Sequence, residues 1–212
     1  ALLVAGSYGK IGAAVLSASA CLRSGVGLLT AHVPKCGYEI IQTSVPEAMV
    51  SIDSDEKFIT DNIHLEKYNA IGIGPGLAAE KQTQNILKVL IQNAAVPMVL
   101  DADALNILSE NKTWLSFLRK GTILTPHPKE FDRLTGLTLT PEDRFKEQLS
   151  FSRRYNVYVV LKGSRSSSYE REQSQALLYA EMMDNIEFGE VVSAQTLSMM
   201  VYFAEQQAII TN

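Results

Sequence analysis

The sequence predicts an α/β protein with a mostly parallel sheet covered by helices on both faces. Short β-branched or aliphatic runs alternate with helical patterns along most of the 212 residues. Several of these runs end in glycine-rich or polar residues, where open parallel sheets bind their ligands. Since the sequence contains no internal repeat, low-complexity stretch or linker, a single domain over residues 1–212 is expected.

The elements follow one another in a regular order. Strands are predicted at residues 2–5, 27–33, 70–73, 97–100, 122–124 and 157–161. Helices are predicted at residues 12–23, 80–93, 104–118 and 142–154, with another beginning near residue 129. Further helical patterns are present at residues 170–183 and 193–210.

Composition narrows the class of protein. With 46% apolar residues the chain can bury a core, and with a net charge of −4 and dispersed Lys and Arg it is not expected to bind nucleic acid. No apolar run reaches the roughly 18 residues of a membrane span, so no membrane is expected as a partner. Cys21 and Cys36 have neither CxxC spacing nor a neighbouring His cluster, which favours a reducing cytoplasm and argues against a zinc site.

The sequence begins with a strand-like run and lacks the basic flank of a signal peptide. A mature domain rarely begins inside a strand. We therefore expect an upstream segment to be missing from the sequence.

Two glycine-rich stretches follow predicted strands. The loop at residues 6–12 leads directly into a helix, so it is either a pyrophosphate cradle or an ordinary tight turn. Gly74 and Gly76 flank Pro75, which fixes its own φ. This second stretch is either a rigid, side-chain-free wall for a flat ligand or a plain loop.

A pair of carboxylates follows the strand at residues 97–100. Asp103 is predicted to be the N-cap of the next helix. Asp101 still belongs to the strand, where a charged group must be paired or face a wet cleft. It has either a structural role or a functional one, such as orienting a hydroxyl or holding Mg²⁺ through water.

Two prolines bracket His127, which favours a ligand contact over a packing role because the loop is stiff on both sides. Pro128 suits the first position of the next helix, and Glu130 is expected to support the start of that helix through the dipole. After the last predicted strand, Lys162, Gly163 and Ser164 either meet a phosphate or simply leave the sheet for solvent.

Taken together, these motifs resemble the NAD(P)H-hydrate dehydratases. The resemblance covers residues 1–164, with the family's segments in order at residues 12–16, 23–28, 46–50, 74–77, 101–106, 125–131, 134–136 and 161–163. It implies a ribokinase-like, three-layer α/β/α fold. It also implies a hydro-lyase of nicotinamide nucleotide repair, which dehydrates (S)-NAD(P)H hydrate to NAD(P)H at the expense of ADP (bacterial type) or ATP (eukaryotic type), with Mg²⁺.

The resemblance also assigns roles to residues. Ala13, Gly76 and His127 would contact the hydrated dinucleotide. The loop of Lys162, Gly163 and Ser164 would contact the adenine nucleotide, with Asp101 and Asn106 in support, and no protein-bound metal is expected. Hydroxide is a poor leaving group, so phosphorylation of the ring hydroxyl would make its departure easy. A homo-oligomer is expected. The sequence does not decide whether the donor is ADP or ATP, or whether an epimerase domain lies upstream.

One family signature is missing. A Gly-Ser-Gly-Asp stretch, whose Asp would be the catalytic base, does not follow Ser164, and Asp184 is the only aspartate in the unassigned tail at 165–212. Either the protein is an enzyme whose sequence has lost a segment between about residues 164 and 193, or it is a relative that binds nucleotide without catalysis. A ribokinase-like kinase of a small alcohol would need the same Asp. The intact substrate-side motifs favour the enzyme.

Overall fold

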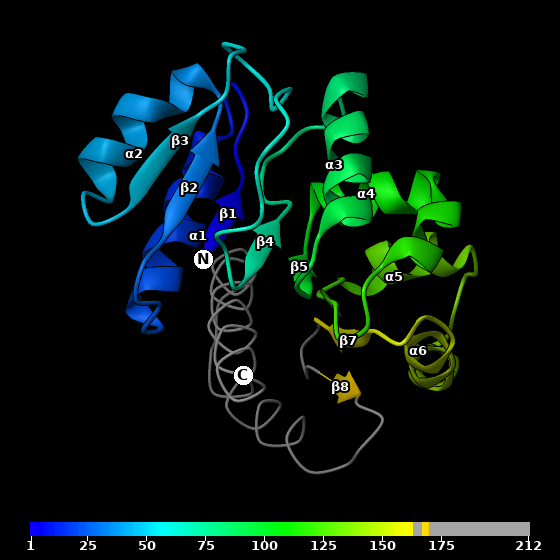
Figure 1. The fold of residues 1–212 in the computed structure, drawn as a ribbon. Helices are drawn as coiled ribbons and strands as arrows, with labels where there is room; N and C mark the ends of the chain where they lie inside the picture. The colour runs from blue at the N-terminus through cyan, green and yellow to red at the C-terminus, as the bar shows by residue number, and fades with distance from the viewer. Residues whose placement is uncertain (163–166, 170–212) are drawn as a thin grey trace.

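Parallel strands form the centre of the structure (Figure 1), a computed structural model that describes residues 1–162 and 167–169. Their order across the sheet is β3-β2-β1-β4-β5-β6-β7, and β8 adds an antiparallel strand beyond β7. The mostly parallel sheet is therefore confirmed. The strands are β1 (Leu2–Val4), β2 (Thr30–Val33), β3 (Met49–Ile52), β4 (Ile71–Ile73), β5 (Met98–Leu100), β6 (Ile123–Leu124), β7 (Tyr158–Leu161) and β8 (Ser167–Tyr169).

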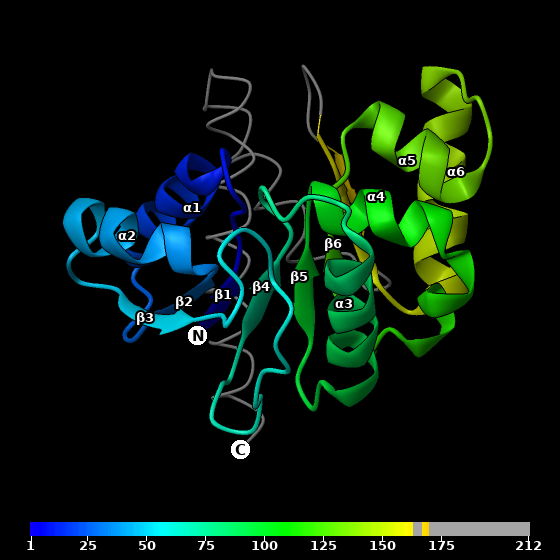
Figure 2. The same cartoon turned by 90° about the horizontal axis from the view of Figure 1, so that it is seen from above.

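Helices cover both faces of this sheet, as Figure 2 shows from above. One face carries α1 (Ile11–Arg23), the short 3-10 helix η1 (Lys35–Gly37) and α2 (Tyr38–Ser44). The other face carries α3 (Lys81–Asn93), α4 (Asp103–Glu110), the 3-10 helix η2 (Lys112–Phe117), α5 (Pro128–Thr135) and α6 (Pro141–Tyr155). The predicted three-layer α/β/α architecture is confirmed.

Strand β1 shows how the two faces share the core. Leu2 and Val4 are buried in the cluster formed with α3 to α6, whereas Leu3 is buried in the cluster that includes Ala14 and Ala18 of α1. Successive residues of a strand point to opposite faces, and residues four apart on a helix share one face. A strand buried on both sides must be apolar at every position, which is why its sequence does not alternate.

Several parts of the chain differ from the expectation, among them β8, for which no strand was predicted. The helix predicted at 104–118 was wrong, because it breaks at Asn111 into α4 and η2. At Asn111 the backbone leaves the helical conformation, with φ −125° and ψ 53°. Its side chain donates from Nδ2 at 2.9 Å to the Ile107 carbonyl oxygen, which also accepts from the Asn111 backbone N–H at 3.1 Å. No helix or strand was predicted for residues 38–52, where α2 leads into β3, an edge strand of the sheet.

The helix ends use conventional signals. Pro128 and Pro141 begin α5 and α6, while Gly136 and Asn156 end them in left-handed conformations, with φ of 78° and 54°. In the described part of the chain, no helix combines the length and apolarity needed to cross a membrane. The helical patterns expected at residues 170–183 and 193–210 lie outside the described residues.

Candidate active site

The strand order places the two glycine loops side by side. The chain moves in one direction across the sheet from β1 to β2 and β3, and in the other direction from β4 to β7, so the order reverses between β1 and β4. The loop after β1 and the loop after β4 flank this reversal. In open α/β sheets the crevice at such a switch point binds ligands.

Direct hydrogen bonds join these two loops. The Gly6 N–H donates to the Pro75 carbonyl oxygen at 2.8 Å, and the buried Ser7 hydroxyl donates to the Gly76 carbonyl oxygen at 2.7 Å. A Cβ added at Gly76 would lie 3.0 Å from the Cβ of Ala13, so only glycine permits this approach of the loop to the start of α1. Ala13 and Gly76, two of the predicted dinucleotide contacts, therefore lie together.

The carboxyl ends of β5 and β7 meet in a buried ion pair. Asp101 is completely buried, and the Lys162 Nζ lies 2.5 Å from its Oδ1. The backbone N–H of Lys162 also donates to the carbonyl oxygen of Pro126, in the loop after β6, at 2.9 Å. Three neighbouring loops are thus tied together, and the expectation that a charged Asp101 must be paired or hydrated is met by pairing.

Glu130 is a second buried carboxylate in this cluster. Burial raises the pKa of Glu130 above its usual value, although the hydrogen bond from the His127 N–H and the charges of Lys162 and His127 act against the rise. The charge of Asp101 raises the pKa of Glu130 further. One ammonium group therefore lies among two carboxylates at this end of the sheet.

His127 combines exposure with a structural role. Its side chain is 46% exposed, yet its Nδ1 accepts hydrogen bonds from the N–H groups of Lys129 and Glu130 at 3.1 and 3.2 Å. The Glu130 Oε2 in turn accepts from the His127 N–H at 2.8 Å, which completes a capping box. Pro128 is the first residue of α5, as predicted. The expected support from Glu130 is confirmed, but as a direct hydrogen bond at the helix start.

This double role separates two substitutions of His127. His127→Ala removes the cap, so we expect a loss of about 1 kcal/mol in unfolding free energy together with weaker binding of the hydrated dinucleotide. His127→Asn keeps an oxygen that can cap α5, so we expect near wild-type stability with the same loss of binding. Urea unfolding and titration calorimetry of both variants would test this. Normal binding by His127→Asn would show that His127 acts only as a cap.

Asp103 differs from the prediction, which was wrong in making it the N-cap of α4. The N-cap is Ala102, with φ 48° and ψ −119°, a conformation that L residues rarely adopt. The chain turns so sharply after β5 that Asp103 is already helical, and its carboxylate extends toward other loops. Its Oδ2 accepts from the Ala78 N–H at 2.9 Å and lies 3.3 Å from the Lys10 Nζ.

Asn106 extends these contacts to the helix that His127 begins. Its Oδ1 accepts from the Arg133 guanidinium at 2.7 Å, and its Nδ2 lies 3.5 Å from the Asp103 Oδ1. A line of polar contacts thus runs from Lys10 in the first glycine loop to α5. The supporting role proposed for Asn106 stays a prediction, but its position between the two halves of the site agrees with it.

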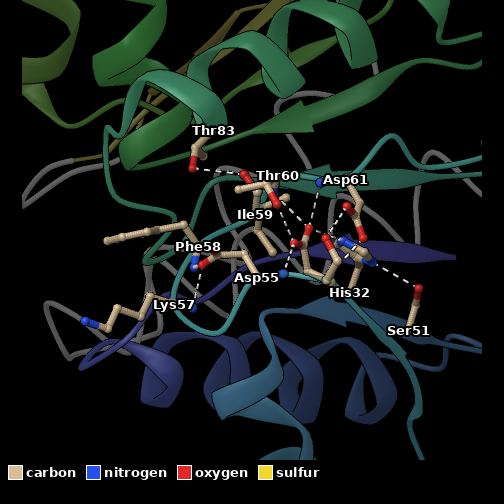
Figure 3. A network of polar contacts seen from close by, with 11 residues as sticks. His32, Ser51, Asp55, Lys57, Phe58, Ile59, Thr60, Asp61 and Thr83 are labelled. Carbon is tan, nitrogen blue, oxygen red and sulfur yellow. Dashed lines mark hydrogen bonds and ion pairs between the residues drawn. The ribbon is translucent and has the colours of Figure 1, made fainter.

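A buried polar network that was not predicted lies beside β2 and β3, and Figure 3 shows it. His32 of β2 lies with its Nε2 3.2 Å from the Asp53 Oδ2 and its Nδ1 2.9 Å from the Ser51 hydroxyl. Asp53 is completely buried and accepts from the N–H groups of Asp55, Thr60 and Asp61. The signal for this network in the sequence is the run of Asp, Ser and Thr at residues 51–61, since side chains of these types hydrogen-bond to the backbone of turns.

The charges in this network follow from its geometry. Burial lowers the pKa of His32, although the hydrogen bond to Asp53 acts in the opposite direction. Burial alone would raise the pKa of Asp53, but the hydrogen bonds from Asp55, Asp61 and Thr60 outweigh it and hold that pKa below its usual value. A charged carboxylate therefore sits at the centre of the loop and orders it.

Some of the predicted site lies outside the described residues. Gly163 and Ser164 lie there, and so does Asp184, the only aspartate of the tail. The chain break expected between about residues 164 and 193 also falls outside the described residues, and the catalytic base stays unassigned. Within residues 1–162 and 167–169, no group of three or more His, Cys, Asp and Glu side chains is arranged to hold a metal ion.

The family to which this site points emerges from comparison with known proteins. Residues 1–179 match a family model described as NAD(P)H-hydrate dehydratase. The ADP-dependent (S)-NAD(P)H-hydrate dehydratase of Staphylococcus aureus is 36% identical over 163 residues, which cover 76% of this chain and 57% of that protein. The first curated relatives are bifunctional NAD(P)H-hydrate repair enzymes, and the matched segment spans about a third of their length.

Solved structures agree on the architecture. A ribokinase-like superfamily protein from Enterococcus faecalis superposes with a TM-score of 0.68 at 20% identity, covering 98% of this chain and 79% of that one. The ADP/ATP-dependent NAD(P)H-hydrate dehydratase of Bacillus subtilis, co-crystallised with ATP and Mg²⁺, has a TM-score of 0.66 at 25% identity, covering 99% and 79%. The fold is ribokinase-like, as the sequence implied.

Proposed function

The chain belongs to the NAD(P)H-hydrate dehydratase family, and we propose that it dehydrates (S)-NAD(P)H hydrate to NAD(P)H with ADP or ATP as phosphoryl donor. The observation that supports this most is the arrangement of one sheet edge. Ala13 and Gly76 lie at the switch point between β1 and β4, and the Asp101–Lys162 pair lies a few strands away at β5 and β7. A dinucleotide and a phosphoryl donor can therefore meet on the same edge.

The proposed reaction has two steps. The hydroxyl oxygen of the hydrated ring attacks the terminal phosphorus of the donor, its proton passes to a base, and ADP or AMP leaves. The ring carbon–oxygen bond then breaks with its electron pair on the departing inorganic phosphate, and loss of a proton from the adjacent carbon restores the double bond. Phosphorylation converts a poor leaving group into a good one, so phosphoryl transfer supplies the driving force.

We assign the residues by their place on the edge. Ala13, Gly76 and His127 contact the dinucleotide, and Lys162 faces the phosphates of the donor with Gly163 and Ser164 beside it. Asp101 holds the Lys162 ammonium in one position, which suits a group that must meet a phosphate without rearranging. Asn106 supports the same edge through Asp103 and Arg133.

Mg²⁺ belongs to the proposal as a partner of the nucleotide phosphates. Mg²⁺ usually keeps several waters and is bound by one or two carboxylates plus substrate phosphates. In the proposal, Mg²⁺ therefore arrives with the nucleotide. Its chemistry when bound would be neutralisation of phosphate charge.

The wider setting is also part of the proposal. The bifunctional names and greater length of the first curated relatives support an additional domain in the whole protein, of which an epimerase upstream is the one we propose. A reducing cytoplasm is also proposed, since Cys21 and Cys36 have neither CxxC spacing nor a neighbouring His cluster. A homo-oligomer stays a prediction.

The direct test is turnover. The full chain is incubated with hydrated NADH or hydrated NADPH and with ADP or ATP, and recovery of the reduced nicotinamide absorbance is followed. We expect recovery that requires both an adenine nucleotide and Mg²⁺. Binding of both ligands without recovery would contradict the enzyme and indicate a non-catalytic relative. Phosphorylation of a small alcohol in place of the hydrate would indicate a kinase.

A further inference from the structure

Tyr8 is an exposed aromatic residue in the first glycine loop. Its side chain is 66% exposed, although its neighbours Gly6 and Ser7 are buried and bonded to the Gly76 loop. The Tyr8 N–H donates to the Lys57 carbonyl oxygen at 2.8 Å, and the Lys57 Nζ lies 5.5 Å from the centre of the Tyr8 ring. An aromatic face and a cation are therefore held together beside the switch point.

The position of Lys57 is set by the missed polar network. Asp53 accepts from the Asp55 N–H, and the Asp55 carboxylate accepts from the N–H groups of Lys57 and Phe58 at 2.7 and 2.9 Å. Figure 3 shows Asp55, Lys57 and Phe58 on this loop, with the Lys57 side chain extending away from His32. The buried Asp53 thus anchors a loop that presents Lys57 and supports Tyr8 through its backbone.

The strand order indicates which part of the substrate reaches this place. The phosphoryl donor is assigned to the end of β7, so the hydrated ring must lie near β6 and β7 to be phosphorylated. β1 lies four strand spacings from β7, which is about 19 Å at about 4.8 Å per spacing. This span is comparable to an extended dinucleotide. The opposite half of the substrate, with its flat adenine and phosphates, therefore extends toward Tyr8 and Lys57.

We propose that Tyr8 and Lys57 form a subsite for the adenosine half of the hydrated dinucleotide, an inference that rests on the proposed function. The Tyr8 ring stacks on the adenine base, and the Lys57 ammonium binds a phosphate of the dinucleotide. That phosphate is either the pyrophosphate or the 2′-phosphate of the NADPH form. Asp53 is the positioning residue, acting through Asp55.

The test uses the full chain with hydrated NADH and hydrated NADPH, measured by steady-state kinetics and by titration calorimetry without nucleotide. We expect Tyr8→Ala to raise the KM for both substrates roughly 5- to 100-fold, as loss of a base–aromatic stack does. The KM for ADP or ATP and the kcat should stay unchanged, because the contact is equal in the ground and transition states. Tyr8→Phe should behave like the wild type.

Lys57→Ala is expected to raise the KM roughly tenfold, and Lys57→Arg to recover most of the loss. An equal rise in KM for both substrates would place Lys57 at the pyrophosphate. A larger rise for hydrated NADPH would place it at the 2′-phosphate. The matched controls are Lys88→Ala, whose Nζ lies 5.8 Å from the Trp114 ring, and Phe117→Ala, another exposed aromatic. Both should leave the kinetics unchanged.

Two outcomes would overturn the subsite. In the first, Tyr8→Ala and Lys57→Ala both keep the wild-type KM and dissociation constant for the hydrated dinucleotide. In the second, the variants lose affinity for the adenine nucleotide as much as for the dinucleotide. If the wild type binds the hydrated dinucleotide without converting it, the proposed function fails while calorimetry still decides the subsite. If the wild type does not bind the dinucleotide at all, both proposals fall.

Discussion

Replacing Gly74 with alanine is expected to lower the free energy of unfolding by about 3–5 kcal/mol. Gly74 has φ of +139°, and a Cβ added there would lie 1.8 Å from the carbonyl oxygen of Asp101. No side-chain rotation can relieve that overlap because the obstacle is backbone. The ends of β4 and β5 would have to separate, and Asp101 would move with them.

Urea unfolding followed by circular dichroism would measure this loss. Gly12→Ala is the matched control, since a Cβ at Gly12 meets nothing within 4 Å and Gly12 lies in α1. That variant should stay within about 0.5 kcal/mol of the wild type or be slightly more stable. If Gly74→Ala were as stable as the control, the close approach of the two strands would be contradicted.

Lys162→Met is expected to have an effect of similar size on stability and to act on nucleotide binding as well. Removal of the ammonium leaves the Asp101 carboxylate buried without this counter-ion, and breaking such a pair costs about 3–5 kcal/mol. The double variant Lys162→Met/Asp101→Asn removes both charges, so it should recover most of that stability. Comparing the two variants separates the charge imbalance from the loss of a ligand contact.

The ligand effect is measured by thermal shift. For the wild type, ADP or ATP at about a hundred times its dissociation constant should stabilise the protein by about 2.7 kcal/mol. The stable double variant should lose most of this shift but retain binding of the hydrated dinucleotide. Equal losses for both ligands, or an unchanged nucleotide shift, would contradict the placement of Lys162 at the donor phosphates.

Local sequence predicted most of the elements because those elements have a periodic signature. A strand buried on both faces is continuously apolar, as in β1, and prolines at helix starts predicted α5. The break at Asn111 escaped prediction because the apolar pattern continues through it. The non-helical backbone conformation of Asn111 ends the helix, and the apolar pattern carries no sign of it.

The candidate site also has a part that the sequence predicted and a part that it did not. The sequence was enough to name several candidate residues, because each follows an apolar strand and is not needed for packing. They are the glycines after β1 and β4, Asp101 after β5, His127 after β6 and Lys162 after β7. The sequence did not show that Ala102, and not Asp103, is the N-cap of α4, since this depends on how sharply the chain turns after β5. Nor did it show the capping role of the His127 ring.

By itself, the sequence determined the fold class, most of the succession of strands and helices, and the loops that carry the candidate ligand-binding residues. Tertiary structure alone decided which loops meet. Asp101 and Lys162 are 61 residues apart in the sequence, and they pair because a single strand, β6, separates β5 from β7 in the sheet. His32 and Asp53 meet because β2 and β3 are neighbours. The physical reason is that strand order depends on long-range packing and loop closure, which leave no periodic trace in the residues themselves.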